Sequence, residues 1–583
     1  MLRASLFAAA LFAASAFAQV PAQDSRNTLI PNTDTHFTPP TYKTLAQWQE
    51  RREHLRKQIL SAAGLLPMPP KTPLHPQIFG RIENRTYSIE KVLLETMPGY
   101  YLGGNLYRPL RAAPPGGFPA IASPHGHWNY GRLENTDVAS VPARCINLAE
   151  QGYVVFAYDM VGYDDTIQTP HDFATPRDNL WDFGPLPLQL WNSIRVVDFL
   201  ESLPGVNPQK IGATGASGGG TQTFLLAAVD DRVAFDAPVN MLSTIMQGGS
   251  PCENSPNLRF DTFNLEFGAI MAPRPMMMVS ATGDWTRNTP REEYPFMKSI
   301  YELYDRAANL DMVQIEAPHN YNRQSREAVY KFFGHHILGE TDDTKLKEKG
   351  IRVEKLGDML ALFNRKLPDN ALDLEGVRAE WIERGKQAAA HPTPQASKEM
   401  LQLALGAEWP KHVIAEMPGE QFLLTREGKG DRVTGFWLHG QGTPILLVHP
   451  DGAEAARKSP ELAAVVKQGR PVYVMEPFQT GSAVAPRKRD DKMFLTFNRT
   501  DDAERVQDIL TTLAWMKPAA VELVGIGKAA VWCQFAAAIA PVPVTFHSDL
   551  GSFTGTDQDF LDAFFVPGIQ RAGGLAAAKA LTR

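Results

Sequence analysis

A short glycine-rich stretch between two apolar segments constrains the fold of this chain more than any other feature. Residues 211–214 are typical of a short buried strand, and residues 221–229 of a mostly apolar helix. Between them, residues 215–219 have the pattern Gly-x-Ser-x-Gly. A strand that turns sharply into a helix at Ser217 needs neighbours with almost no side chain, because the backbone at such a turn is strained. The stretch therefore predicts a strand–turn–helix unit with a serine hydroxyl exposed at the turn.

The segments around this stretch alternate between strands and helices. A β-hairpin is expected over residues 87–96 and 100–107, turning at Pro98 and Gly99. Further strands are expected at residues 120–123, 154–158, 233–239, 275–280 and 312–316, with helices at 143–150, 188–203 and 325–338. This alternation predicts an α/β fold, a mostly parallel sheet with helices on both faces. In such sheets, functional groups gather beyond the carboxyl ends of the strands.

Two further side chains meet that criterion. Asp284 follows the strand that ends at residue 280, and His319 follows the strand that ends at residue 316. The order Ser217, Asp284, His319 is the order of an α/β-hydrolase triad. Neither residue alone indicates catalysis, because an Asp after Gly usually belongs to a turn and a lone His is usually a hydrogen-bonded surface or core residue. Together they predict a serine nucleophile, a histidine that accepts and returns its proton, and an aspartate that orients the imidazole.

The oxyanion that forms in such a reaction needs hydrogen-bond donors. We expect one from the amide of Gly218 and a second from the loop around Gly126 and His127. Loop capping or substrate contact is an alternative role for His127 and its neighbour His125. For Asp164 and Glu253 we favour loop capping. The candidate substrate-binding residues lie in loops near the expected strand ends; they are His125, Trp128, Tyr163, Gln247 and Tyr321.

Composition limits the class of protein. With 583 residues the chain is too long for one ordinary domain, and 44% hydrophobic and 21% charged residues are typical of a globular protein. A net charge of −6 without a long basic run argues against nucleic acid as a partner. Cys145, Cys252 and Cys533 are too few and too scattered for a disulfide framework or a metal knuckle. We expect buried, inert thiols, with one bridge at most.

The first residues indicate export. Arg3 precedes an apolar run at residues 6–14, and Ala16-Phe17-Ala18 matches a cleavage site. The run is too short to span a bilayer comfortably. We therefore predict a signal peptide over residues 1–18, a periplasmic or extracellular protein, and no membrane attachment after cleavage.

The rest of the chain suggests four parts. Residues 19–75 are expected to form an N-terminal arm and a bracing helix that begins with a capping box at Thr44 and Gln47. Residues 76–340 form the expected catalytic domain. Residues 341–408 form a helical linker interrupted at the prolines of 391–394.

Residues 409–583 repeat the pattern of the first half. An Arg-x-x-Asp pair lies 22 residues before Ser217, at 195–198, and the same pair at 505–508 lies 22 residues before Gly527. Glycine thus replaces the serine, and too few residues follow to supply strands with an acid and a base. We predict a truncated, non-catalytic hydrolase-like domain. We expect it to bury apolar surface of the first domain or to build an oligomer. Walling the substrate cleft or binding carbohydrate is the alternative.

Several motifs together resemble a known group. They are His125-Gly126-His127, residues 215–221, residues 272–275, Gly283-Asp284-Trp285 and residues 318–321. Over roughly residues 40–340 the chain resembles the acetyl xylan esterase-like branch of the α/β-hydrolases, with dienelactone hydrolases and prolyl oligopeptidase-like enzymes as neighbours. The resemblance implies hydrolysis of a small-molecule or oligosaccharide ester through an acyl-enzyme, without a metal ion or organic cofactor. These motifs are specific for the superfamily and not for a substrate.

Two alternatives compete with an esterase. A prolyl oligopeptidase-like peptidase usually carries a propeller before the hydrolase fold, and the about 100 preceding residues are too few for its blades. A non-catalytic scaffold is disfavoured because the serine is lost from the second copy alone. The sequence indicates neither the acyl group nor the oligomeric state.

Overall fold

The computed structural model describes residues 20–582, so the predicted signal peptide at 1–18 lies outside the described part. By contacts the described chain divides into two compact units. The first unit comprises residues 33–175 and 183–388, and the second comprises residues 20–32, 176–182 and 389–582. Over residues 20–582, every helix is too short or too polar to cross a membrane.

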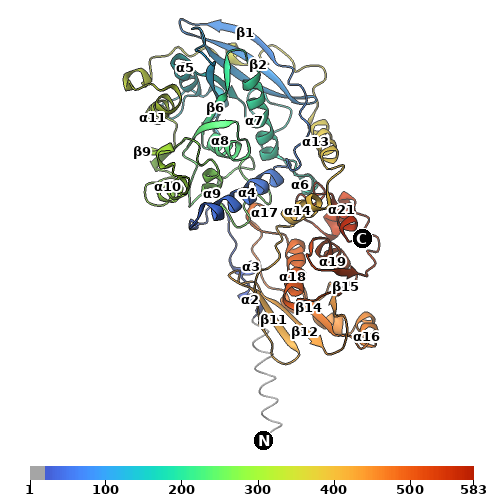
Figure 1. The fold of residues 1–583 in the computed structure, drawn as a ribbon. Helices are drawn as coiled ribbons and strands as arrows, with labels where there is room; N and C mark the ends of the chain where they lie inside the picture. The colour runs from blue at the N-terminus through green and yellow to red at the C-terminus, as the bar shows by residue number, and fades with distance from the viewer. Residues whose placement is uncertain (1–19, 583) are drawn as a thin grey trace. The chain divides into compact units, whose positions relative to one another are not determined.

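The first unit is built around a nine-stranded sheet with the order β1-β2-β3-β5-β4-β6-β7-β8-β9 (Figure 1). Its strands are β1 (Gln77–Glu83), β2 (Tyr87–Met97), β3 (Tyr100–Pro109), β4 (Phe118–Pro124), β5 (Val154–Tyr158), β6 (Val206–Ala216), β7 (Val233–Val239), β8 (Met276–Gly283) and β9 (Leu310–Pro318). From β5 to β9 all neighbouring strands are parallel, whereas β1, β2 and β3 pair antiparallel. The predicted hairpin and mostly parallel sheet are confirmed.

Helices cover both faces of this sheet. They are α4 (Leu45–Ala62), α5 (Val141–Gln151), α7 (Pro185–Ser202), α8 (Gly218–Val229), α9 (Asn264–Ala269), α10 (Glu293–Leu303), α11 (Arg323–Phe333), α12 (Leu356–Met359) and α13 (Leu374–Ala388), with short turns η1 (Gly131–Leu133), η2 (Ala307–Asn309), η3 (Gly334–Leu338) and η4 (Asp343–Leu346).

Alternation along the strands divides the core in two. On β5, Val154 and Phe156 pack with α4, α7, α8, α9 and α10, while Val155 and Ala157 pack with α5 and α11. Successive side chains of a strand point to opposite faces, so one short apolar strand serves both cores. Such a doubly covered sheet leaves its carboxyl edge as the accessible place for polar loops.

Helix α4 begins as the sequence suggests, with one difference. The Thr44 side chain accepts a hydrogen bond from the amide of Gln47. The Gln47 side chain, however, accepts from the amide of Lys43 and not from that of Thr44. The reciprocal half of the capping box is thus shifted by one residue. The helix buries Trp48, Leu55 and Ile59, among others, against the core of the first unit.

The second unit contains a seven-stranded sheet with the order β10-β11-β12-β14-β13-β15-β16. Its strands are β10 (Val413–Glu416), β11 (Gln421–Arg426), β12 (Val433–Leu438), β13 (Ile445–Val448), β14 (Val472–Glu476), β15 (Val521–Gly525) and β16 (Val544–Phe546). This order matches the first seven strands of the other sheet, position by position. The counterparts of β8 and β9 are missing among the described residues, which confirms a truncated second hydrolase-like sheet.

The helices of the second unit are α2 (Val20–Gln23), α3 (Ser25–Thr28), α6 (Pro176–Leu180), α14 (Pro394–Leu405), α15 (Ala453–Arg457), α16 (Pro460–Val466), α17 (Phe494–Phe497), α18 (Asp501–Met516), α19 (Ala529–Ile539), α20 (Asp557–Ala563) and α21 (Gly574–Leu581), with the short turn η5 (Gly481–Ala483). The domain limits expected from the sequence stay predictions. By contacts, residues 20–32 group with the second sheet and residues 33–75 with the first.

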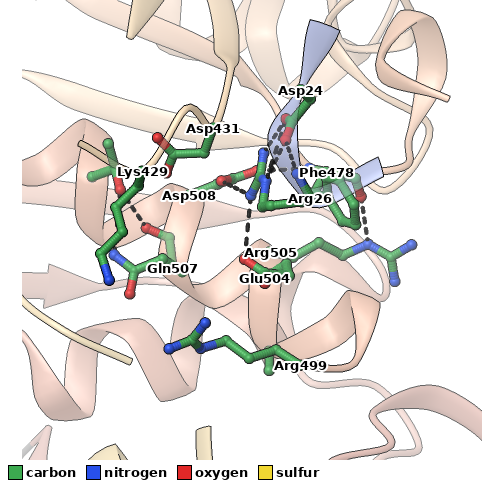
Figure 2. A network of polar contacts seen from close by, with 12 residues as sticks. Asp24, Arg26, Lys429, Asp431, Phe478, Arg499, Glu504, Arg505, Gln507 and Asp508 are labelled. Carbon is green, nitrogen blue, oxygen red and sulfur yellow. Dashed lines mark hydrogen bonds and ion pairs between the residues drawn. The ribbon is translucent and has the colours of Figure 1, made fainter. Parts of the chain in front are cut away.

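A buried ion-pair network holds residues 20–32 in the second unit (Figure 2). The Arg26 guanidinium bonds to Asp508 at 2.6 Å and to Asp24 at 2.7 Å, and lies 3.4 Å from Glu504. The same guanidinium sits 4.2 Å from the centroid of the Phe478 ring. A buried charge is tolerated only when partners surround it. The N-terminal segment therefore contributes the cation that neutralises acidic groups of α18.

Candidate active site

The glycine-rich stretch forms the predicted turn between β6 and α8. Ser217 has φ 58° and ψ −127°, a backbone conformation that residues with a side chain rarely adopt. A Cβ on Gly215 would lie 2.6 Å from the carbonyl oxygens of Gly219 and Pro124, so this position excludes a side chain. The Ser217 amide donates to the Val239 carbonyl at 3.1 Å. The serine is thus fixed at the carboxyl end of β6, at the first turn of α8.

The predicted acid and base meet at the same edge. Asp284 follows β8, and its Oδ2 lies 2.8 Å from Nδ1 of His319, which follows β9. The other oxygen, Oδ1, accepts from the amide of Thr286 at 2.7 Å and from its hydroxyl at 2.5 Å. The aspartate side chain is 2% exposed and that of the histidine 23% exposed. Both carboxylate oxygens are therefore used, one to hold the loop and one to hold the imidazole.

Two tryptophan rings lie close to the His319 ring. The Trp285 ring centroid lies 4.3 Å from that of His319, and the Trp128 ring stacks at 6.1 Å. Trp128 and Ser217 both approach Gly126, because a Cβ on this glycine would lie 3.1 Å from the Trp128 Nε1 and 3.1 Å from the Ser217 Cβ. The Nε2 atom of His319 is buried and has no hydrogen-bond partner within residues 20–582. This nitrogen is available for a proton from the serine or from a substrate.

Backbone amides approach the serine from two sides. Gly218 is the first residue of α8, and the first amides of a helix have no acceptor within the helix. The Gly126 loop approaches from the end of β4, as its short distance to Ser217 shows. The amide of Trp128 is already used, because it donates to the Gly126 carbonyl at 2.8 Å. The structure thus brings Gly218 and the Gly126–His127 loop together around Ser217.

His125 is buried and fully engaged. Its Nε2 accepts from the Met160 amide at 2.9 Å, so Nδ1 carries the proton that it donates to the Gly126 carbonyl at 2.7 Å. Burial lowers the pKa of His125 to about 3. The Tyr163 ring packs edge-on against His125, with centroids 5.1 Å apart. His125 joins the loop after β4 to the loop after β5, and its role as a substrate contact stays a prediction.

Two other predicted pocket residues are enclosed by protein. The Gln247 side chain donates to the Ser243 carbonyl and accepts from the Asn264 amide. The Tyr321 hydroxyl bonds to Thr214 on β6 at 2.7 Å. Both side chains are buried to 2% exposure or less. The structure therefore gives them places beneath the strand ends, and substrate contact by either also stays a prediction.

Asp164 and Glu253, for which we favoured loop capping, both accept hydrogen bonds from loop groups. Asp164 accepts from the Arg132 amide at 3.0 Å. Glu253 accepts from the Thr221 hydroxyl and from the amides of Gly249 and Ser250.

Sequence reasoning missed a cluster beside the serine. His127 Nε2 lies 3.1 Å from His171 Nε2 and 3.1 Å from the Cys252 sulfur. These residues follow β4, β5 and β7, far apart in the sequence, so no spacing pattern could reveal them. Burial lowers the pKa of His127 to about 4 and also lowers that of His171, and it raises the pKa of the Cys252 thiol well above its usual range. All three are therefore uncharged at neutral pH when no ligand is bound.

The second unit contains the matching turn without the matching chemistry. Gly527 follows β15 and has φ 52°, close to the 58° of Ser217. A Cβ on Gly525 would meet Ala529 and Ala530 at 2.6–2.7 Å, much as one on Gly215 would meet the first turn of α8. The turn is preserved, but glycine stands at the position that Ser217 occupies in the first unit.

Comparisons with known proteins agree with this architecture. No protein-family model matches the chain. The "Putative hydrolase YtaP" of Bacillus subtilis is 26% identical over 261 residues, which cover 41% of this chain and 83% of that protein. Among solved structures, "Methylesterase BT1017" is 28% identical with a TM-score of 0.50, covering 62% of this chain and 77% of that one.

A structure described as a "putative acetyl xylan esterase" from Bacteroides fragilis has 14% identity and a TM-score of 0.40, covering 52% of this chain and 87% of that one. The sheet order, the strained serine turn, and the hydrolase and esterase relatives at 26% and 28% identity lead to one conclusion. The first unit has the α/β-hydrolase fold, and the chain is similar to hydrolases and esterases.

Proposed function

We propose that the protein is an exported serine hydrolase that cleaves carboxylic esters through an acyl-enzyme. The observation that carries the proposal is the 2.8 Å contact between Asp284 Oδ2 and His319 Nδ1, at the same edge of the sheet as a serine in a strained turn. Because Asp284 accepts the Nδ1 proton, the neutral imidazole presents a lone pair on Nε2. That lone pair is what a general base needs.

In the proposed reaction, His319 Nε2 takes the hydroxyl proton as Ser217 Oγ attacks the ester carbonyl carbon. Negative charge moves to the carbonyl oxygen, where the amides of Gly218 and the Gly126–His127 loop donate to it. The imidazolium then protonates the leaving alcohol, and the acyl group stays on Ser217. Water, deprotonated by the same imidazole, attacks the acyl-enzyme and regenerates the free serine.

We propose an esterified carbohydrate as the substrate. The sequence motifs resemble acetyl xylan esterase-like enzymes, which favours an acetyl group on a saccharide. The solved relative at 28% identity is a methylesterase, which favours instead a methyl ester of a sugar acid. The two differ in which half of the ester is the sugar. In both, the small half of the ester would lie near Ser217 and His319, whose ring lies against those of Trp128 and Trp285.

The test is a substrate panel measured on the mature chain. Release of acetate from acetylated xylo-oligosaccharides and of methanol from methyl-esterified oligogalacturonides is compared for wild type, Ser217→Ala and Ser202→Ala. Ser202 is an exposed serine at the end of α7 and serves as the matched control. We expect turnover of one ester class by wild type and S202A, with a loss of several orders of magnitude in S217A.

The peptidase alternative is tested in the same panel. Aminoacyl and prolyl anilides are included with the esters, and faster cleavage of an anilide than of every ester would contradict an esterase. Failure to cleave any substrate, together with no reaction of Ser217 with an active-site phosphonate, would favour a scaffold.

A further inference from the structure

We infer that His127, His171 and Cys252 form a three-ligand binding site for a zinc ion next to the serine turn. One ring nitrogen of each histidine and the cysteine sulfur lie within 4.8 Å of one another. They extend from the loops after β4, β5 and β7, three neighbouring segments at the carboxyl edge of the first sheet. This inference does not depend on the proposed ester hydrolysis.

The spacing of the donor atoms fits one metal ion. Tetrahedral zinc, with bonds of about 2.0–2.1 Å to nitrogen and about 2.3 Å to sulfur, separates two nitrogens by roughly 3.3 Å and nitrogen from sulfur by roughly 3.6 Å. Here His127 Nε2 lies 3.1 Å from His171 Nε2 and 3.1 Å from Cys252 Sγ. Small shifts of the side chains would therefore complete three bonds. A fourth position stays open for water or another small ligand.

A hydrogen bond outside the cluster orients the His171 ring, as is common for histidines that bind a metal. His171 Nδ1 lies 2.7 Å from the Val161 carbonyl, to which it donates, so the lone pair of this neutral ring is on Nε2 within the cluster. The carboxyl group of Glu253 is buried next to Cys252.

The donor set also selects the class of metal. Two imidazoles and one thiolate suit zinc and disfavour magnesium and calcium, which prefer oxygen ligands. A second group of potential ligands, His125, Asp159 and Asp164, differs in this respect. There the histidine nitrogens are already hydrogen-bonded, and Arg132 forms ion pairs with both aspartates.

Binding changes the protons of the cluster in a defined way. Zinc forms a bond to the Cys252 sulfur as the S–H bond breaks, and the proton passes to the buffer. Without metal, the contact between the two Nε2 atoms requires the His127 proton on Nε2, because the lone pair of His171 faces it. With zinc on that nitrogen, the proton moves to His127 Nδ1, on the side of the ring next to Gly218.

One consequence rests on the proposed function. A Cβ on Gly218 would lie 3.0 Å from His127 Nδ1, so a proton on this nitrogen would lie near Gly218, the residue whose amide we assign to the oxyanion. Zinc would thereby fix three loops around Ser217 and add an N–H donor to them. The metal site itself is tested without any substrate.

The experiment uses cobalt(II) as a spectroscopic substitute for zinc, added to the metal-free, reduced mature chain. We expect one Co²⁺ per chain and a thiolate-to-cobalt charge-transfer band in the near ultraviolet, displaced by zinc and not by magnesium. Cys252→Ser should lose the band, and His171→Ala should bind at least about tenfold more weakly. Cys533→Ser, which removes a buried thiol of the second unit, and Ser217→Ala should both keep it.

A second measurement needs no variant and so does not depend on how the variants fold. Calorimetric titration of wild type with zinc in buffers of different ionisation enthalpy should show release of about one proton at neutral pH, that of the Cys252 thiol. Absence of stoichiometric Co²⁺ binding, a band that survives in C252S, or zinc binding without proton release would overturn the site. Intact Co²⁺ binding with no ester hydrolysis would support the metal site and count against the proposed function alone.

Discussion

Replacing Asp284 with asparagine tests how the acid controls the histidine. Asparagine keeps the shape of the side chain and makes one of its two terminal atoms a donor. The Asp284 carboxylate receives three donors, the amide and hydroxyl of Thr286 on Oδ1 and His319 Nδ1 on Oδ2. The single amide oxygen of the asparagine in D284N can face only one side of this arrangement. It must satisfy either the two donors of Thr286 or the one donor of His319.

The first orientation is favoured, and it inactivates the base. Facing the oxygen toward Thr286 keeps two hydrogen bonds. Turning it away leaves the Thr286 amide against an NH₂ group and makes the Thr286 hydroxyl, which already accepts from the Ala281 amide, give up the bond that it donates. At about 1–3 kcal/mol for each lost or unsatisfied bond, the difference is about 2–6 kcal/mol. In the favoured state the amide NH₂ faces His319 and forces the ring proton onto Nε2, which then cannot accept the serine proton. We therefore expect kcat to fall by about 10²–10⁴ at neutral pH.

The assay is single-turnover hydrolysis of 4-nitrophenyl acetate, with thermal denaturation to show that D284N stays folded. A second change sharpens the test. D284N/T286V lacks one of the two donors that fix the wrong orientation, so we expect kcat to recover by about 5–30-fold relative to D284N. T286V alone should stay close to wild type, because Asp284 still binds His319. A D284N enzyme within tenfold of wild type, or a double variant no faster than D284N, would refute the reasoning.

Three further predictions concern stability. Replacing Arg26 with methionine leaves the buried carboxylate of Asp508 without its cation and should lower the free energy of unfolding by about 3–5 kcal/mol. Urea denaturation, followed by a probe in the second unit, measures this loss, and R26M/D508N should recover at least half of it. Equal stability of R26M and wild type would contradict the role of the network. For His125 the folded pKa of about 3 lies below the unfolded value of about 6.5, so its contribution is complete above pH 6.5 and is lost as the pH falls toward 3. The difference in unfolding free energy between wild type and H125Q should therefore shrink below pH 6.5 by up to about 1.4 kcal/mol per pH unit, whereas a constant difference between pH 7.5 and 4.5 would argue against a buried neutral ring. On β6, a Cβ at Gly212 would lie 2.2 Å from the Phe235 ring, so G212A should destabilise the first unit by about 1–3 kcal/mol in the same denaturation assay, and a variant as stable as wild type would show that the ring moves freely.

Much of the first unit could be predicted because its central strands are buried on both faces. Short apolar runs such as residues 120–123 and 154–158 stand out between polar loops, and the Gly-x-Ser-x-Gly turn fixes where one strand becomes a helix. Asp284 and His319 could be paired across 35 residues because parallel strands end at one edge. The regular geometry of the sheet made that inference possible.

Other features depend on contacts that leave no local pattern. Strand β1 is mostly half-exposed, with neither an apolar run nor clear alternation, and was not predicted. A polar residue after a strand end, such as Gln247 or Tyr321, can face a substrate or a protein group, and its neighbours in sequence do not show which. The His127 cluster likewise joins three loops that meet only in the folded chain.

The grouping of residues 20–32 with the second sheet has a similar origin. Its contacts include a buried arginine, Arg26, whose acidic partners Glu504 and Asp508 lie nearly 500 residues away. Ionic contacts of this kind carry no periodic signal in the sequence. The repeat of the two sheets, in contrast, was visible because strand order and the 22-residue spacing before the turn follow the chain.

Phosphonylation shows directly whether Ser217 is an activated nucleophile. The mature chain is treated with a fluorophosphonate and digested, and the modified peptide is mapped by mass spectrometry, with S217A and S202A alongside. We predict one adduct per chain on Ser217, formed by wild type and S202A, absent from S217A, and formed several orders of magnitude more slowly by His319→Ala. A folded wild-type chain that forms no adduct, or forms it on a residue other than Ser217, would show that Ser217 is not the nucleophile.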